Sequence, residues 1–205
     1  MKILEATLKN IIEASRIVKK GGLVVFPTET VYGLGCDPFN VGSVQRLIEI
    51  KGNRTKPFPI LISSMNDARK IANLSLNGKK LATRFWPGPL TIIFPKKSTL
   101  PDIVTFNQKS VGLRIPDNKV AIKLIRLCGG ILIGSSANKT GRNPPKNIDE
   151  IPEELEEIVD IVLNGGPTSQ GVPSTVVDFI SEKPKILRDG PINLKQLLNV
   201  LALSS

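Results

Sequence analysis

The sequence of 205 residues contains no histidine, and its two cysteines, Cys36 and Cys128, lie far apart without a CxxC spacing. Zinc sites in proteins are built chiefly from these two residue types. The sequence therefore predicts no protein-bound metal site of this kind. Two isolated thiols also fit a reducing compartment, so we expect a cytoplasmic protein.

Aromatic residues are few as well, with seven Phe, one Tyr and one Trp. None of them is clustered among basic residues, whereas proteins that bind single-stranded RNA stack bases on aromatic platforms. Positive charge, in contrast, is abundant, and the formal net charge is +10. Such a charge attracts polyanions, so nucleic acids and nucleoside triphosphates are both candidate ligands. The alternative is that the basic surface serves only solubility.

No apolar run approaches the ~20 residues that a membrane-spanning helix needs, and residues 1–5 lack the apolar core of a signal peptide. The phosphate-binding motifs GxxxxGK[ST] and GxGxxG are absent too, so any nucleotide is expected to be held by side-chain cations and hydroxyls. The length and an apolar content of 40% predict one domain over residues 1–205, with no room for a second.

Strands and helices are predicted to alternate along most of the chain. Apolar runs bounded by Gly, Pro or polar residues predict strands at 23–26, 59–62, 90–94, 111–115, 131–133, 161–163, 174–179 and 185–187. Apolar residues at helical spacing predict helices at 10–20, 41–50, 67–72, 79–85, 118–128, 152–159 and 194–203. Residues 95–108 read as a polar surface loop. The order predicts the α/β class, with a twisted, largely central mixed sheet flanked by helices.

Polar clusters follow several of the predicted strands. The stretch PTETVYGLG at 27–35 places two threonine hydroxyls, a carboxylate and a phenol directly after a buried apolar run. Ligands in α/β proteins gather at the carboxyl ends of strands. Further clusters lie at 51–56, 110–114, 135–138 and 174–175, and Arg188 adds a cation. Each cluster alone fits a turn or a helix cap, but together they predict one polar cavity.

Six motifs carry a resemblance to a known family. They are FPTETVYGLG at 26–35, WPGPLT at 86–91, VGLRIP at 111–116, SANKTG at 136–141, PSTVVD at 173–178 and ILRDG at 186–190. In this order the sequence resembles the single-domain branch of the YrdC-type threonylcarbamoyl-AMP synthases over roughly residues 10–190. The resemblance implies a single YrdC-like domain with a basic concave cavity.

The resemblance also implies a reaction in which L-threonine, bicarbonate and ATP give threonylcarbamoyl-adenylate and pyrophosphate. The product serves the threonylcarbamoyladenosine modification at position 37 of tRNA. Thr30, Arg114 and Ser174 are implied to hold threonine, with the Arg114 guanidinium on its carboxylate as a bidentate fork. Such a site needs positioning residues rather than a dedicated nucleophile.

On the nucleotide side, the resemblance implies Lys51 and Arg54 as catalytic cations that lie with Lys56 against the triphosphate. The other residues implied to contact the nucleotide are Ser110, Ser136, Asn138 and Arg188. Mg²⁺ is expected to enter with ATP and to bridge its phosphates largely through water. The implied partners are the small-molecule substrates, downstream tRNA-modification proteins and, as a further candidate, tRNA or double-stranded RNA.

Three positions depart from the family pattern. The usual Lys-x-Arg motif reads Lys51-x-Asn53 here, with an arginine one place later at Arg54. Phe58 and Asn118 lie in regions where many members carry a histidine. These departures leave open a paralogue with an altered substrate. They also leave two alternatives, which are a module that binds double-stranded or structured RNA without catalysis and a related enzyme that uses a carbamoyl-adenylate.

Overall fold

The computed structural model describes residues 2–180 and 184–202. Its helices are α1 (Leu8–Lys19), α2 (Val41–Lys51), α3 (Met65–Ile71), α4 (Leu76–Phe85), α5 (Asp102–Thr105), α6 (Lys119–Leu127), α7 (Glu153–Glu156) and α8 (Leu194–Ala202), with one 3₁₀ turn at Ile148–Glu150. Its strands are β1 (Ile3–Glu5), β2 (Val24–Phe26), β3 (Gly33–Gly35), β4 (Ile60–Ile62), β5 (Leu90–Pro95), β6 (Ser110–Arg114), β7 (Ile131–Ile133), β8 (Ser135–Ser136), β9 (Ile161–Asn164), β10 (Thr175–Asp178) and β11 (Lys185–Arg188).

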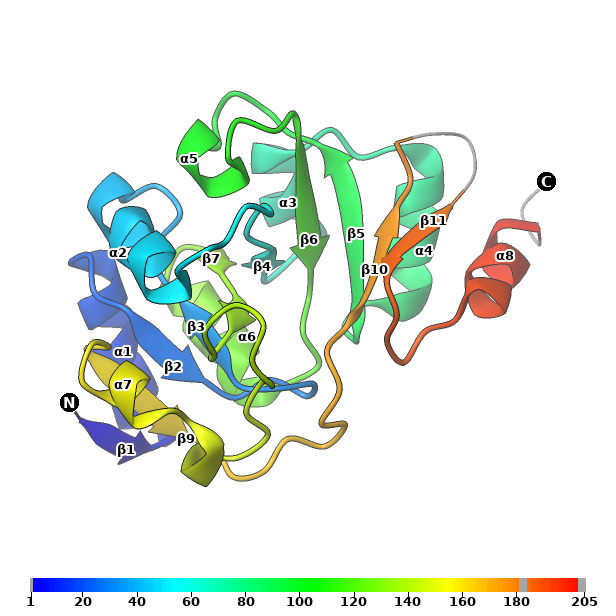
Figure 1. Ribbon diagram of the computed structural model, residues 1–205. Coiled ribbons are helices and arrows are strands. Elements are labelled where there is room, and N and C mark those ends of the chain that lie inside the picture. The colour runs from blue at the N-terminus through cyan, green and yellow to red at the C-terminus, as the bar shows by residue number, and fades with distance from the viewer. Residues whose placement is uncertain (1, 181–183, 203–205) are drawn as a thin grey trace.

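The predicted α/β class is confirmed, but the strands form two mixed sheets instead of one central sheet (Figure 1). One sheet has the order β1-β9-β2-β3-β8, and the other has the order β11-β10-β5-β6-β4-β7. The first lies with α1, α2 and α7 on one side of the molecule, and α4 and α8 lie beside β5, β10 and β11 on the other. The chain passes from the six-stranded to the five-stranded sheet between β7 and β8, which Gly134 alone separates.

Several predicted boundaries are wrong in detail. The strands β1 and β3 were not predicted, since Ile3–Glu5 has only three residues and Gly33–Gly35 reads as a turn. The segment 95–108 is not wholly a surface loop, because it contains α5 and buries Leu100 and Val104. The acidic helix predicted at 152–159 is confined to α7. Residue 203, the predicted end of the last helix, lies outside the described residues.

Side-chain caps begin most of the longer helices, as their sequences lead one to expect. Thr7, Asn40, Ser64, Ser75 and Asn118 each accept a hydrogen bond from a backbone N–H in the first turn of the helix that follows. Such caps satisfy donors that the helix itself leaves unpaired, and each stabilises by about 1 kcal/mol. The predicted cap at Asn118 is thereby confirmed, with 3.0 Å from its Oδ1 to the N–H of Ala121.

Two apolar clusters hold the elements together. In the smaller one, the buried stripe of α1, which includes Ala14 and Val18, shares a cluster with Leu124 and Ile125 of α6. The larger one lies on the far side of the strands and includes Leu113 of β6. Each fully buried side chain of this kind contributes roughly 1.5–3 kcal/mol. The clusters fix both sheets, and so they fix the strand ends from which the polar side chains emerge.

A close approach of main chains joins the sheets. The amide of Ile133, at the end of β7, donates to the Cys36 carbonyl at 3.0 Å. A Cβ on Gly35 would lie 2.2 Å from the carbonyl oxygen of Ile133, so only glycine fits there. The glycine-rich end of the 27–35 stretch is therefore needed for packing β3 against β7.

Candidate active site

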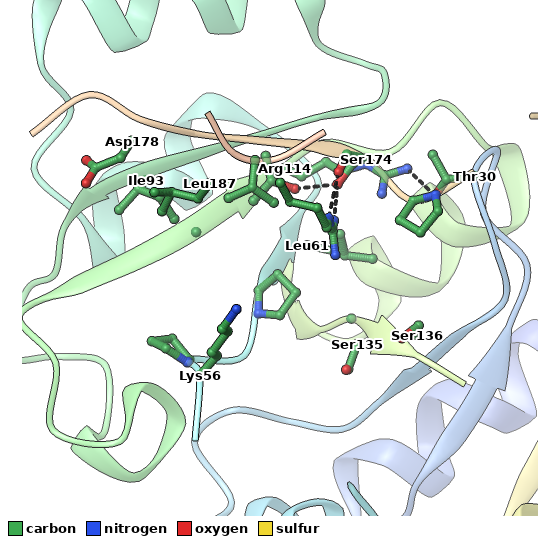
Figure 2. Close-up of a pocket in the computed structure, with 18 of the residues that line it drawn as sticks. Thr30, Lys56, Leu61, Ile93, Arg114, Ser135, Ser136, Ser174, Asp178 and Leu187 are labelled. Atoms are coloured by element: carbon green, nitrogen blue, oxygen red, sulfur yellow. Dashed lines mark hydrogen bonds between the residues drawn. The ribbon is translucent and has the colours of Figure 1, made fainter. Parts of the chain in front are cut away.

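A cavity of about 500 Å³ lies between the two sheets, and one face of the six-stranded sheet forms much of its lining (Figure 2). Alternate residues of three strands point into it, in the series 91/93 on β5, 110/112/114 on β6 and 176/178 on β10, which Ser174 directly precedes. The residues between them, such as Ile92, Leu113 and Val177, are buried in the larger apolar cluster. This period of two is what a strand with one face toward the cavity and one toward the core requires.

Eight of the ten predicted site residues line this one cavity, so the structure brings these distant polar clusters together. They are Thr30, Arg54, Lys56, Ser110, Arg114, Ser136, Ser174 and Arg188. In Figure 2, Thr30, Arg114 and Ser174 gather toward one end, Asp178 lies at the other, and Lys56 and Ser136 lie across from them. Lys51 and Asn138 are not among the lining residues.

Arg114 is buried and already has three contacts. Its Nε donates to the Gly88 carbonyl at 3.1 Å, and its Nη2 donates to Thr30 Oγ1 at 3.0 Å. Nη2 also lies 2.6 Å from Oε2 of Glu29. The donors on the Nε–Nη2 edge of the guanidinium are therefore occupied. The predicted bidentate contact with a carboxylate has to use Nη1 together with Nη2, and Nη2 has to give up one of its present partners.

The motif WPGP at 86–89 explains the first of these contacts. The indole of Trp86 donates to the Leu90 carbonyl at 2.6 Å, and the amide of Gly88 donates to the Ile115 carbonyl at 2.9 Å. The turn is thus held at the start of β5 and just after the end of β6, and the Gly88 carbonyl accepts from Arg114. This turn therefore fixes the Nε end of the guanidinium.

Thr30 is held by the turn that precedes β3. Thr28 Oγ1 donates to the Val31 carbonyl at 2.6 Å and lies 2.9 Å from Thr30 Oγ1. Because the proton of Thr28 goes to Val31, Thr30 donates to Thr28 and accepts from Arg114. The chain of hydrogen bonds sets the direction of both hydroxyls and leaves Thr30 one acceptor position toward the cavity.

Ser174, Thr91 and Arg188 form a second network on the same sheet face. Ser174 Oγ lies 2.8 Å from Thr91 Oγ1 and accepts from Arg188 Nη2 at 2.9 Å. Arg188 Nε donates to the Ser174 carbonyl at 2.9 Å. Burial and the nearby charge of Arg114 lower the pKa of Arg188. Two guanidinium groups therefore face the same space, and an anion between them would be stabilised.

Arg54 and Lys56 come from the loop between α2 and β4. Arg54 donates to the carbonyls of Lys56 at 2.9 Å and Pro57 at 2.7 Å, and its guanidinium lies 4.5 Å from the centre of the Phe58 ring. Burial and the charge of Arg188 lower the pKa of Arg54 to about 10. Arg54 is thus fixed in place, as a cation that contacts phosphate has to be.

Lys51, the last residue of α2, lies behind the cavity. Its Nζ donates to the Ser136 carbonyl at 2.9 Å, to the Asn138 carbonyl and to Asn138 Oδ1 at 3.3 Å. Burial, together with the charge of Arg54, lowers the pKa of Lys51 to about 7. In this arrangement Lys51 holds the loop that carries Ser136. Its predicted contact with the triphosphate, and that of Asn138, stay predictions.

Three residues of the site were not predicted. Thr91 and Asp178 line the cavity, and each is a single polar residue on the cavity face of a largely apolar strand. Glu29, in the 27–35 stretch, is 3% exposed and pairs with Arg114. Nothing in the sequence placed residues 29 and 114 in contact, because the contact joins the two sheets.

The described residues contain no group of three or more Asp, Glu, Cys or His side chains placed to hold a metal ion. Asp178 is the carboxylate among the cavity-lining residues. Mg²⁺ is usually bound by one or two carboxylates together with substrate phosphates and water, so this donor set fits an ion that arrives with a nucleotide. Within residues 2–180 and 184–202, no helix is long and apolar enough to cross a membrane.

Residues 16–190 match the sequence model of the Sua5/YciO/YrdC family, whose description reads "Telomere recombination". Over 190 residues the chain is 35% identical to a threonylcarbamoyl-AMP synthase of Pyrococcus abyssi, which covers 92% of this chain and 56% of the relative. Over 203 residues it is 33% identical to a putative threonylcarbamoyl-AMP synthase of Mycobacterium tuberculosis, which covers 98% of this chain and 93% of the relative. The chain thus spans little more than half of the archaeal relative.

The fold has a close counterpart among solved structures. The crystal structure of P. abyssi Sua5 complexed with L-threonine superposes with a TM-score of 0.92 at 34% sequence identity, over 98% of this chain and 59% of that one. The family match extends over most of the residues that build both sheets and the cavity between them. The chain belongs to the Sua5/YciO/YrdC family.

Proposed function

We propose that the chain synthesises threonylcarbamoyl-adenylate from L-threonine, bicarbonate and MgATP, the first step of threonylcarbamoyladenosine formation in tRNA. The observation that carries the proposal is the cavity itself, in which Arg114, Thr30 and Ser174 share one space with Arg54, Lys56 and Arg188. An amino acid and a triphosphate need these two kinds of group side by side. The names of the relatives and the Sua5 complex with L-threonine support the same substrates.

The reaction needs two bond-forming steps in this cavity. The neutral amine of threonine attacks the carbon of bicarbonate, and water leaves to give a carbamate. A carbamate oxygen then attacks the α-phosphorus of ATP, the bond between the α-phosphorus and the bridging oxygen breaks, and pyrophosphate leaves with that electron pair. No step requires a protein nucleophile, which suits a chain without histidine.

The residues of the cavity supply position and charge. Arg114 offers Nη1 to the amino-acid carboxylate, while Thr30 and Ser174 offer hydroxyl groups beside it. Arg54, Arg188 and Lys56 stabilise the charge that develops on phosphate oxygens. Mg²⁺ bound to ATP neutralises further phosphate charge. Holding carbamate and phosphate together supplies much of the acceleration, since orientation is worth roughly 7–11 kcal/mol in favourable cases.

Release of pyrophosphate by the purified protein tests the proposal. We expect release from MgATP that requires both L-threonine and bicarbonate, with the adduct of all three detected by mass spectrometry. Release that is independent of threonine, or none when all three substrates are present, contradicts the proposal. L-serine, which lacks the methyl group of threonine, and glycine, which lacks the whole side chain, serve as matched substrates.

A further inference from the structure

Four cationic side chains line the cavity, and one differs from the others in its partner. Arg54 and Arg188 donate to main-chain carbonyls, at Pro57 and Ser174 among others. Within the described part of the chain, no acidic side chain forms an ion pair with Arg54, Lys56 or Arg188. Arg114, in contrast, lies 2.6 Å from Glu29. The cavity thus combines three cations without an acidic partner and one cation with such a partner.

Glu29 is a fixed partner. Its side chain is 3% exposed in the ion pair, and it is not among the residues that line the cavity. Its main-chain carbonyl accepts from the amide of Gln170 at 2.9 Å and from Ser169 Oγ at 3.2 Å, which ties the turn to the loop at 167–173. The carboxylate is therefore buried beside Arg114, on a turn whose main chain is held in place.

The ion pair with Arg114 is the one polar contact found for the Glu29 carboxylate among the described residues. Neither of its oxygens accepts a hydrogen bond among the described residues, although Oε2 lies close to Arg114 Nη2. A buried carboxylate without hydrogen-bond donors is costly, and such groups are retained where their charge has a use. Among the ion pairs of the described residues, Glu29 takes part in one, with Arg114, so its charge acts most strongly on this guanidinium.

The two kinds of cation suit two kinds of anion. A triphosphate carries several negative charges and is attracted mainly by net charge, whereas a carboxylate is recognised well by the planar donors of a guanidinium. An unneutralised Arg114 would attract the triphosphate more strongly than a carboxylate with a single charge. A neutralised Arg114 keeps its donors but loses most of this attraction.

We propose that Glu29 is a positioning residue that neutralises Arg114, so that polyphosphate binds at Arg54, Lys56 and Arg188 while Arg114 is kept for the carboxylate of the amino acid. This inference rests on the proposed function of the cavity and explains how that cavity separates its two anionic substrates. The lowered pKa values of Arg54 and Arg188, caused by burial and by neighbouring guanidinium groups, agree with cations that await an anion.

The test replaces Glu29 with glutamine, which keeps the size of the side chain and removes its charge. Inorganic tripolyphosphate serves as the probe, and its binding is measured by isothermal titration calorimetry at fixed salt. We expect Glu29→Gln to bind tripolyphosphate at least about tenfold more tightly than the unsubstituted protein, because the cavity gains one net positive charge. Threonine is expected to bind beside tripolyphosphate in the unsubstituted protein and to compete with it in the variant.

Two further variants complete a charge series. Glu29→Asp keeps the charge, and we expect tripolyphosphate binding within about twofold of the unsubstituted protein. The double variant with Glu29→Gln and Arg114→Met removes both charges of the buried pair, a replacement that proteins often tolerate. It is expected to bind tripolyphosphate as the unsubstituted protein does and to lose threonine. If Glu29→Gln does not fold, comparison of the double variant with Arg114→Met alone keeps the test decisive. Arg114→Met keeps the charge of Glu29 and is expected to bind tripolyphosphate more weakly than the double variant, and equal binding overturns the role of Glu29.

Glu13→Gln is the matched control, because Glu13 pairs with Lys2 at 2.8 Å on the surface, away from the cavity. Glu13→Gln should change the affinity for neither tripolyphosphate nor threonine. Equal tripolyphosphate affinity in Glu29→Gln and the unsubstituted protein, without competition by threonine, overturns the role of Glu29. Failure of the proposed function looks different, since the unsubstituted protein would then release no threonine-dependent pyrophosphate even if the charge series came out as expected.

Discussion

At the scale of single residues, Arg114 joins the two halves of the site, because its three contacts come from Gly88, Thr30 and Glu29. Replacing it with alanine removes the donors for the amino-acid carboxylate. We expect the KM for threonine to rise about 100-fold, which corresponds to the roughly 3 kcal/mol lost when one partner of a buried charged pair is truncated. The KM for MgATP should change far less.

Steady-state kinetics with each substrate varied in turn measure this difference. Arg46→Ala is the matched control, because Arg46 pairs with Asp160 at 3.1 Å on the exposed surface. Arg114→Ala leaves Glu29 without its ion-pair partner, so a melting curve has to accompany the kinetics. Equal increases in the KM values for threonine and MgATP would show that Arg114 does not serve the amino acid specifically.

Lys51 gives a prediction about pH. Burial and Arg54 lower its pKa from 10.5 to about 7 in the folded protein. Between these values the unfolded chain keeps a proton that the folded chain has lost, so the free energy of unfolding rises with pH. Relative to Lys51→Met, the unsubstituted protein should gain about 2 kcal/mol between pH 7 and about pH 9. Denaturant titrations at several pH values measure the gain, and parallel profiles of the two proteins would refute it.

At the scale of elements, β6 lines the cavity with Ser110, Gly112 and Arg114. A Cβ on Gly112 would lie 3.0 Å from Thr91 Cγ2 and 3.2 Å from Ile93 Cδ1, so a larger residue has to project into the cavity. We expect Gly112→Val to weaken nucleotide binding roughly tenfold, or about 1.4 kcal/mol, by filling this space.

Titration with a fluorescent ATP analogue measures the effect of Gly112→Val. Gly42→Ala on α2 is the control, since its Cβ would meet only Asn40 Oδ1, at 3.5 Å. Nucleotide affinity that is unchanged in Gly112→Val, in a variant that melts at the same temperature, would place the nucleotide elsewhere.

Elements of this kind could be predicted from the sequence where one physical signal dominated. Apolar runs marked β2, β4 and β7, and the cap at Asn118 marked the start of α6. The strand at Gly33–Gly35 escaped prediction because its two glycines read as a turn, and one of its partners, β8 at Ser135–Ser136, lies far along the chain. The polar positions of the cavity were predictable from motifs, but the contact of Glu29 with Arg114 required the packing of one sheet on the other.

At the scale of the whole molecule, the site exists because two sheets meet. The five-stranded sheet brings Ser136, and the turn between β2 and β3 brings Thr30. The six-stranded sheet brings Arg114 and Arg188. The six-stranded sheet supplies hydroxyls and cations, and the segments at 30 and 136 complete the lining from the other side. Because the site is divided between two sheets, we expect ligands that contact both sheets to stabilise the folded protein.

Inter-ligand nuclear Overhauser effects test most directly whether an amino acid and a nucleotide share this cavity. The sample contains the protein, L-threonine and the magnesium complex of an ATP analogue with a non-cleavable bridge between the α- and β-phosphorus atoms. We predict cross-peaks between the threonine methyl group and the ribose protons, and their loss in Arg114→Ala. Binding of both ligands without any such cross-peak, or displacement of one by the other, would contradict a shared cavity.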